Sequence, residues 1–297
     1  MDAAALGRPL QVGAVTALNV GLALAVGATA LLDRSRQDCM RLLQGGLALA
    51  FVGALALLWW QAAAMGDVPL DQAGGQILPV LRQSHFGHVW LVGVAALLVT
   101  VLLKRAAGSG PAAKQQLALA VPLAIFITAR ASMSHLSADG PLWLAIMDGI
   151  HLAATAAWTG IVFCGVVLLR PRALQRPQQL TALVDRLSTV ATWALGAVAA
   201  TGATMAYRRL DGTVPVNLGS EYLRWLAIKL FLVAAAAGLG AFNRFAVMPS
   251  FMPEGREGQP GRGAYGFARI LMVEALVLLG VLVLAALLAT SAPPTGA

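Results

Sequence analysis

The sequence predicts an all-α fold, a polytopic membrane bundle of about eight transmembrane helices with both termini periplasmic. Composition is the first observation, because 59% of the 297 residues are hydrophobic, 11% are charged, and the mean hydropathy is +0.76. These values exclude a soluble domain of ordinary composition. Length is the second, since a spanning helix needs about 20 apolar residues. We expect a single transmembrane domain over residues 1–297.

Apolar runs bounded by charged residues, glycine or proline mark the predicted helices in order. Lipid offers the backbone no hydrogen-bond partner, so a helix is the state expected for runs of this length. The first run is longer than the roughly 7–15 apolar residues of a signal peptide, and we therefore interpret it as a transmembrane helix. The runs lie near residues 10–32, 41–65, 83–104, 115–135, 141–169, 183–208, 221–247 and 266–290.

The distribution of Lys and Arg predicts the orientation. Of the 21 basic residues, fourteen fall after the first, third, fifth and seventh helices, and the other seven fall on the opposite side. Cytoplasmic loops carry the excess of positive charge, so both termini are expected in the periplasm. The formal net charge of +8 is dispersed over these loops. We therefore expect the lipid bilayer, and no nucleic acid, as a partner.

Motifs for catalysis and for redox chemistry are missing from the sequence. The segment 108–114 is rich in glycine but lacks the spacing of a phosphate-binding loop. The two cysteines, Cys39 in a predicted loop and Cys164 within a predicted helix, form no CxxC motif. The sequence therefore predicts a protein that is not an enzyme and whose two thiols are isolated.

All four histidines lie on or near the predicted periplasmic half of the membrane. His85 and His88 begin the third predicted helix and share one helical face, and His135 ends the fourth. His151 lies about ten residues into the fifth helix, which at ~1.5 Å per residue is near the middle of the bilayer. The four rings suggest a path that descends from the periplasm.

Two methionines accompany these histidines. Met147 is four residues before His151, a spacing that puts both side chains on one face of a helix. Met133 is two residues before His135, so these two would share a site only at a frayed helix end. Thioether and imidazole ligands together suit soft, monovalent copper. The pattern therefore predicts a copper(I) site.

A purely structural role is the alternative for these residues. Membrane histidines are often hydrogen-bonded packing residues, and methionines usually fill space in the core. This alternative applies most strongly to His85 and His88. His151 differs, because an ionisable group deep in lipid is costly and tends to mark a pathway. Asp148, three residues before His151, is expected to orient the imidazole ring by accepting a hydrogen bond.

Other charged residues also fall within predicted helices. Since a charge cannot be left alone in lipid, we expect Asp148 to pair with Arg130 or Lys229, and Lys229 to pair with Glu274. Trp158 lies deep in the fifth helix, and we expect it to pack against a neighbouring helix.

Three short segments resemble the copper resistance D (CopD) family. They are Ser134-His135-Leu136, residues 147–154 with the sequence MDGIHLAA, and Trp158-Thr159-Gly160. Parts of the last three helices continue the resemblance in order, over about residues 80–290. It implies an eight-helix protein of the bacterial inner membrane that acts in copper uptake, often alongside the periplasmic copper-binding protein CopC.

The resemblance also implies site residues. His135, Asp148 and His151 stand at the positions of the polar core of the family. Ser134 replaces the usual glycine, and His85 and His88 stand where other members commonly have threonine and a polar or basic residue. These two histidines are therefore particular to this sequence.

Together, the residues and the resemblance predict copper transport from periplasm to cytoplasm. The predicted metal ligands are His85, His88, Met133 and His135 at the mouth, and Met147 and His151 at an inner site. A membrane b-type cytochrome is one alternative, since histidines on facing helices can hold haem. A copper-binding assembly factor that does not transport is another.

Overall fold

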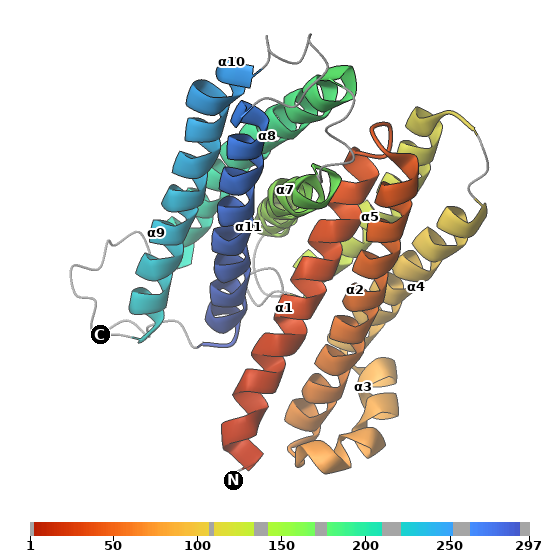
Figure 1. The fold of residues 1–297 in the computed structure, drawn as a ribbon. Coiled ribbons are helices and arrows are strands. Elements are labelled where there is room, and N and C mark those ends of the chain that lie inside the picture. The colour runs from red at the N-terminus through yellow and green to blue at the C-terminus, as the bar shows by residue number, and fades with distance from the viewer. Residues whose placement is uncertain are drawn as a thin grey trace.

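The computed structural model describes residues 3–106, 110–133, 142–169, 177–209, 221–251 and 262–291, and throughout these ranges the regular structure is helical (Figure 1). Eight of the helices in this part of the chain are long and apolar enough to cross a membrane. They are α1 (Ala3–Ala30), α2 (Arg36–Gly66), α4 (His85–Ala106), α5 (Ala112–Ser132), α7 (Leu142–Leu168), α8 (Pro177–Arg209), α9 (Glu221–Phe242) and α11 (Arg262–Ala289). The predicted eight-helix membrane fold is confirmed.

Four short elements were not predicted from the apolar runs. The 3-10 helix η1 (Leu70–Gln76) and the helix α3 (Ile77–Gln83) connect α2 to α4, and a π-helical turn, η3 (Asn243–Val247), leads from α9 into α10 (Met248–Phe251). One predicted location is wrong: Cys39 is the fourth residue of α2 and does not lie in a loop, and its buried Sγ donates to the carbonyl of Leu31 at 3.2 Å. The helix begins at Arg36 and includes the charged residues that suggested a loop.

The spanning helices fall into two groups with α7 between them (Figure 1). Helices α1, α2, α4 and α5 lie on one side, and α8, α9 and α11 lie on the other. Helix α7 contacts α1, α5, α8 and α11. Side chains on α7 can therefore bind both groups, which makes this helix the natural place for a site inside the bundle.

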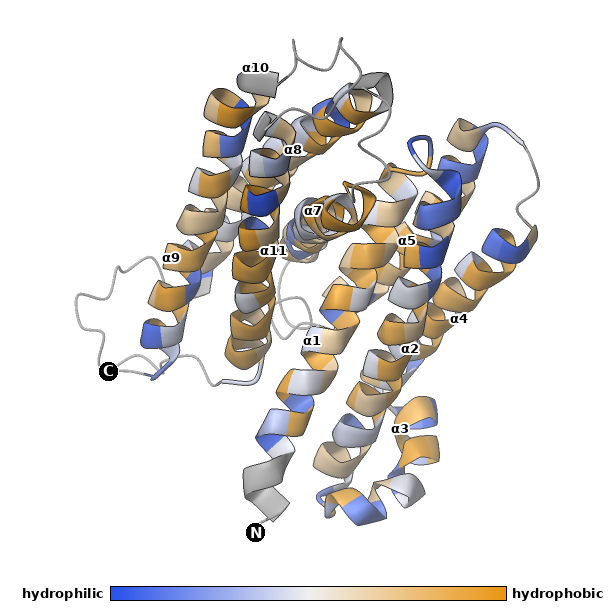
Figure 2. Ribbon diagram, in the orientation of Figure 1, coloured by the Kyte–Doolittle hydropathy of each residue, from blue (hydrophilic) through white to orange (hydrophobic). Residues whose placement is uncertain are grey.

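Apolar residues cover most of the length of the helices, and hydrophilic residues gather near their ends (Figure 2). Large apolar side chains face outward on several helices, among them Val52, Leu102, Leu117, Phe231 and Leu276. Burial in lipid explains this exposure. The C-terminal ends of α1 and α4 lie on the same side of the bundle as α10 (Figure 1). That side is the one predicted to be cytoplasmic.

Helices α1 and α7 approach each other at a pair of glycines. A Cβ atom at Gly160 would lie 2.8 Å from the carbonyl carbon of Ala23 and 2.9 Å from the nitrogen of Gly27. A Cβ atom at Gly27 would lie 2.8 Å from Cα of Gly160. Small residues at such crossings let membrane helices come into backbone contact. This contact fixes α7 against the first group of helices.

Candidate functional site

The imidazole of His151 binds helix α8. Its Nδ1 is 2.9 Å from Oγ1 of Thr201, and that hydroxyl donates its proton to the carbonyl of Ala197 at 2.6 Å. Because a hydroxyl has only one proton, Nδ1–H must be the donor in the first bond. The neutral ring then has its free lone pair on Nε2, as in a histidine that ligates a metal ion.

The backbone of α8 leaves room for this ring. A Cβ atom at Gly202 would lie 3.2 Å from Cε1 of His151, so a larger residue would push the imidazole from its place. Lys229 on α9 lies within electrostatic reach of the same ring. The site is therefore built from α7, which supplies the imidazole, and from α8 and α9 of the second group of helices.

Met147 and Asp148 lie one turn before His151 on α7, and both are half-buried. Met147 shares the helical face of His151, as the spacing of four residues requires. Asp148 lies within electrostatic reach of Arg130 on α5, which is the first of the two pairings predicted for it. The residue that orients the ring through Nδ1 is Thr201.

The two histidines at the start of α4 are exposed and bind different elements. Nε2 of His85 is 3.4 Å from the carbonyl oxygen of Ser132, at the end of α5 and next to Met133. Nε2 of His88 is 3.1 Å from the carbonyl oxygen of Arg82, at the end of α3. The ring of His85 thus contacts the end of α5, at the residue before Met133, and the ring of His88 contacts the end of α3.

His135 lies outside the residues that the structure describes. Its predicted place at the mouth of the path therefore stays a prediction.

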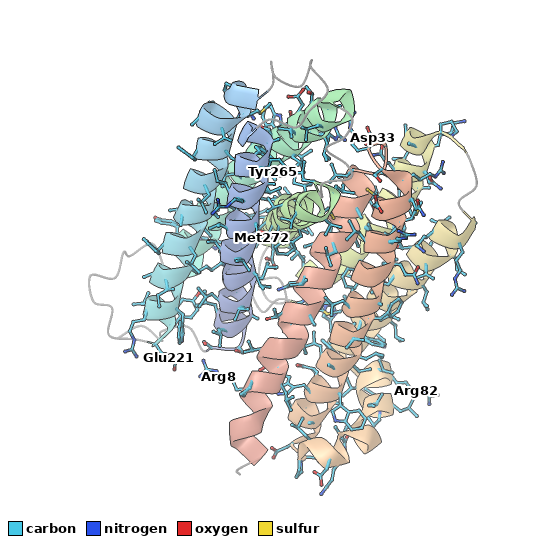
Figure 3. All side chains as sticks on the ribbon, viewed as in Figure 1. Arg8, Asp33, Arg82, Glu221, Tyr265 and Met272 are labelled. Carbon is cyan, nitrogen blue, oxygen red and sulfur yellow. The ribbon has the colours of Figure 1, made fainter. Side chains whose placement is uncertain are left out.

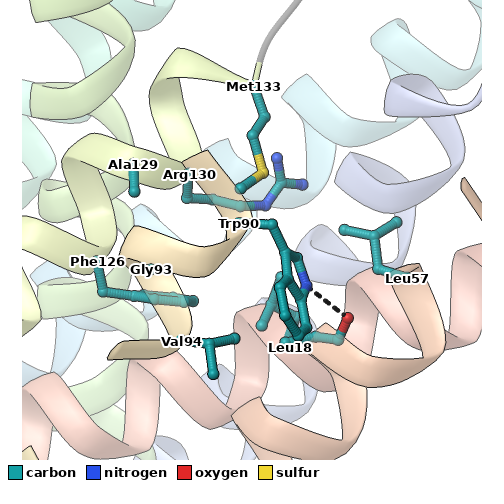
Figure 4. Close-up of a pocket in the computed structure, with 10 residues that line it drawn as sticks. Leu18, Leu57, Trp90, Gly93, Val94, Phe126, Ala129, Arg130 and Met133 are labelled. Carbon is teal, nitrogen blue, oxygen red and sulfur yellow. Dashed lines mark hydrogen bonds between the residues drawn. The ribbon is translucent and has the colours of Figure 1, made fainter. Parts of the chain in front are cut away.

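Met133 lines a small cavity of about 10 Å³ in the first group of helices (Figure 4). Nε1 of Trp90, another lining residue, donates to the carbonyl of Ala54 at 3.0 Å. The side chain of Arg130 lies beside the thioether of Met133 (Figure 4), and its Nε is buried without a hydrogen-bond partner. A cavity of this size has room for about one water molecule, but apart from Arg130 its lining is mostly apolar.

Two contacts of α7 with the second group of helices were not predicted. Thr201 is the partner of His151, although the only signal for it in the sequence is its place in a segment that continues the family resemblance. Trp158 is buried, as expected of a packing residue, but its Nε1 also donates to Oε1 of Glu274 on α11 at 3.3 Å. Glu274, which was predicted to pair with Lys229, thus accepts a hydrogen bond from the indole of Trp158.

Few candidate metal-binding side chains lie together in the described part of the chain. In the ranges that the structure describes, no three side chains of His, Cys, Asp or Glu come close enough together to hold a metal ion. Cys164 is buried, and its Sγ donates to the carbonyl of Leu24 on α1 at 3.7 Å, whereas the ring of His151 binds Thr201 on α8. One imidazole and one thioether on α7 therefore make up the inner candidate site.

Comparison with known proteins agrees with this architecture. The family model described as "Copper resistance protein D" matches residues 181–288, and the model described as "Copper resistance protein D-like, N-terminal domain" matches residues 3–143. The similarity thus extends well before residue 80, where the resemblance in the sequence was expected to begin. No solved structure matches the chain.

A curated relative is similar over most of its length. The "Inner membrane protein YebZ" of Escherichia coli (strain K12) is 27% identical over 261 residues, which are 86% of this chain and 85% of that protein. Its description agrees with a multi-pass protein of the inner membrane, as the eight candidate spans require. This chain belongs to the copper resistance protein D family.

Proposed function

We propose that this protein carries copper(I) across the bacterial inner membrane from the periplasm to the cytoplasm. The inner site is Met147 with His151, on the helix that joins the two halves of the bundle. Copper is collected at the periplasmic mouth by His85, Met133, His88 and His135. The ring of His85 contacts the carbonyl of Ser132, the residue before Met133.

The observation that carries the proposal is the hydrogen-bond chain from His151 to Thr201 to the Ala197 carbonyl. It orients the imidazole and leaves the Nε2 lone pair for a cation, while the thioether of Met147 lies on the same face. A neutral nitrogen and a neutral sulfur bind soft copper(I) without burying a negative charge in lipid. The site can therefore also release its cargo.

Copper suits the described histidines better than haem. A b-type haem is held between two imidazoles at matching depth on different helices. His151 lies well inside α7, whereas His85 and His88 are exposed at the first turn of α4. We infer that CopC, the periplasmic protein found alongside the family, delivers copper to this exposed end.

The membrane potential can drive the cargo inward. Moving one positive charge to a negative interior yields about 2.3 kcal/mol per 100 mV. Cytoplasmic thiols that bind the copper would add a concentration gradient of free copper in the same direction.

Uptake into lipid vesicles tests the proposal. Purified protein is reconstituted in vesicles that contain a copper(I) chelator, and the entry of copper(I) is followed with and without an inside-negative potential. We expect entry above that of protein-free vesicles, faster with the potential, and no Soret band after exposure to haem. Copper binding without entry would instead identify an assembly factor, and a Soret band a cytochrome.

Replacing Met147 by leucine should weaken copper(I) binding by about tenfold or more, equal to about 1.4 kcal/mol. Leucine fills nearly the same volume, so the fold should be kept, while the sulfur ligand is lost. Binding is measured by competition with a copper(I) chelator. The matched control is Met272→Leu, because Met272 faces outward on α11; equal affinities in both variants would exclude the Met147 thioether as a ligand.

Replacing Thr201 by valine should weaken copper(I) binding by about 10- to 100-fold, the usual effect of losing the group that orients a metal-binding histidine. The matched control is Thr204→Val on the same helix. Thr204 also donates to the carbonyl four residues back, Ala200, at 2.9 Å, but is exposed. If the two variants bind copper equally well, Thr201 does not orient His151.

A further inference from the structure

A cavity of about 280 Å³ lies in the second half of the bundle. Residues of α7, α8, α9, η3 and α11 line it, and its polar lining residues are Trp158, Ser188, Thr192, Asn243, Arg244 and Glu274. Helices α8, α9 and α11 form one side of the bundle, next to α7 (Figure 1). The cavity reaches from the middle of the membrane to η3, near the predicted cytoplasmic end.

Glu274 is the buried acid of this cavity. Its side chain lies on α11 and the residue is only 3% exposed. Its Oε1 accepts a hydrogen bond from Nε1 of Trp158 at 3.3 Å. Gly240 on α9 leaves the space for the carboxyl group, since a Cβ there would lie 3.3 Å from Oε1. An ionisable group in such a position is a mark of function in membrane proteins.

Asn243 supplies a second, independent observation. The residue is 3% exposed and lines the cavity. Its Nδ2 donates to the carbonyl of Phe267 at 3.3 Å, but its buried Oδ1 has no hydrogen-bond partner within the protein. A buried acceptor of this kind calls for a donor such as water. Asn243 also begins the π-helical turn η3, a distortion that often marks functional sites.

The charges around the cavity leave the acid without a neighbouring cation at its depth. Of the described residues that line the cavity, only Glu274 and Arg244 are charged. Nη1 of Arg244 is 2.7 Å from the hydroxyl oxygens of both Ser188 and Thr192 on α8, so this guanidinium is held at the η3 end. Helix α7 presents the neutral Trp158, and α1 contributes no residue to the lining.

Besides Arg186 on α8, whose Nε is buried, a half-buried cation of the described helices around this cavity is Lys229 on α9. It precedes Gly240 by eleven residues, or roughly 16 Å along the helix, and its charge acts on His151. The titratable groups of α7 that lie nearest Trp158 along the helix are Cys164, six residues after it, and His151, two helical turns before it.

We propose that Glu274 is a proton-binding site, and that the cavity holds water through which the proton enters and leaves at the Arg244 end. The carboxylate takes a proton from a hydronium ion to give a neutral acid and water, and it returns the proton to water by the same route. Trp158 joins Glu274 to the helix of His151. If the protein transports copper as proposed, proton release from Glu274 can accompany the passage of the copper ion, and only this consequence rests on the proposed function.

Infrared difference spectroscopy of copper-free protein in lipid vesicles tests the proposal. Lowering the pH should produce the carbonyl stretching band of a protonated carboxylic acid, reversibly and with a shift in D₂O. The band should be absent from Glu274→Gln and present in the matched control Glu221→Gln, which removes an exposed carboxylate. If wild type and Glu274→Gln give the same titrating bands, Glu274 does not exchange a proton and the proposal is wrong.

Two further variants guard against loss of the fold. Glu274→Asp keeps a carboxyl group and should keep a titrating band. Trp158→Phe removes the indole donor and should raise the carbonyl stretching frequency, because a hydrogen bond to a carbonyl lowers it. A band with an unchanged frequency in Trp158→Phe would contradict the assignment of the band to Glu274.

This experiment contains no copper, so its result is independent of the proposed transport. A titrating band that depends on Glu274 in a protein without copper uptake supports the proton site and overturns only the transport proposal. Copper uptake without such a band overturns only the proton site.

Discussion

Replacing His151 with alanine is expected to lower copper(I) binding and copper(I) entry into vesicles by at least about tenfold, or about 1.4 kcal/mol in binding. In the proposed inner site the imidazole is the one nitrogen ligand, and the bond from Nδ1 to Thr201 leaves its Nε2 lone pair for a cation. Affinity is measured by chelator competition and entry by the vesicle assay, with the same amount of folded protein in each sample.

Two other substitutions at this position separate ligation from packing. His151→Met offers a soft sulfur and should recover part of the copper binding, whereas His151→Gln fills the site and keeps hydrogen-bonding groups but should remain as weak as alanine. Binding by the glutamine variant at the level of wild type would exclude the imidazole as a copper ligand. Met272, the control position for Met147→Leu, lies on α11 away from this site (Figure 3).

Replacing Gly160 with leucine is expected to destabilise the fold by more than about 3 kcal/mol, the upper end of the usual effect of overpacking. The added side chain would begin 2.8 Å from the carbonyl carbon of Ala23 and 2.9 Å from the nitrogen of Gly27. Backbone atoms cannot move aside as a flexible side chain can, so α1 and α7 would have to separate. Thermal unfolding in detergent should show a large drop in the melting temperature.

Gly196→Leu is the matched control for this prediction. Gly196 lies within α8, and a Cβ atom there would meet nothing within 4 Å. This variant should therefore melt close to wild type. If both leucine variants melt at the same temperature, the contact between α1 and α7 does not hold the two halves of the bundle together.

The membrane helices could be predicted from the sequence because their cause is local. Each apolar run is long enough to cross the bilayer, and lipid leaves the backbone no alternative to a helix. The short helices η1 and α3 escaped prediction because they lie in a connection that combines polar and apolar residues. The location of Cys39 was missed for the same reason, since charged residues precede it in the first turn of α2.

The inner site could be predicted only in part. Met147, Asp148 and His151 lie on one helix, and their spacing determines which of them share a face. Helical spacing carries no information about partners on other helices. The pairing of Asp148 with Arg130 was within reach of sequence reasoning because two opposite charges at similar depth must be close to each other in lipid.

The sequence by itself determined the spanning helices, the soft character of the candidate ligands on α7 and the resemblance to the copper resistance D family. Only the tertiary structure decided that Thr201 orients His151 and that Trp158 binds Glu274, across sequence separations of 50 and 116 residues. The physical reason is that hydrophobic periodicity fixes which residues enter lipid, whereas close contacts such as that of Gly27 with Gly160 fix which helix faces meet.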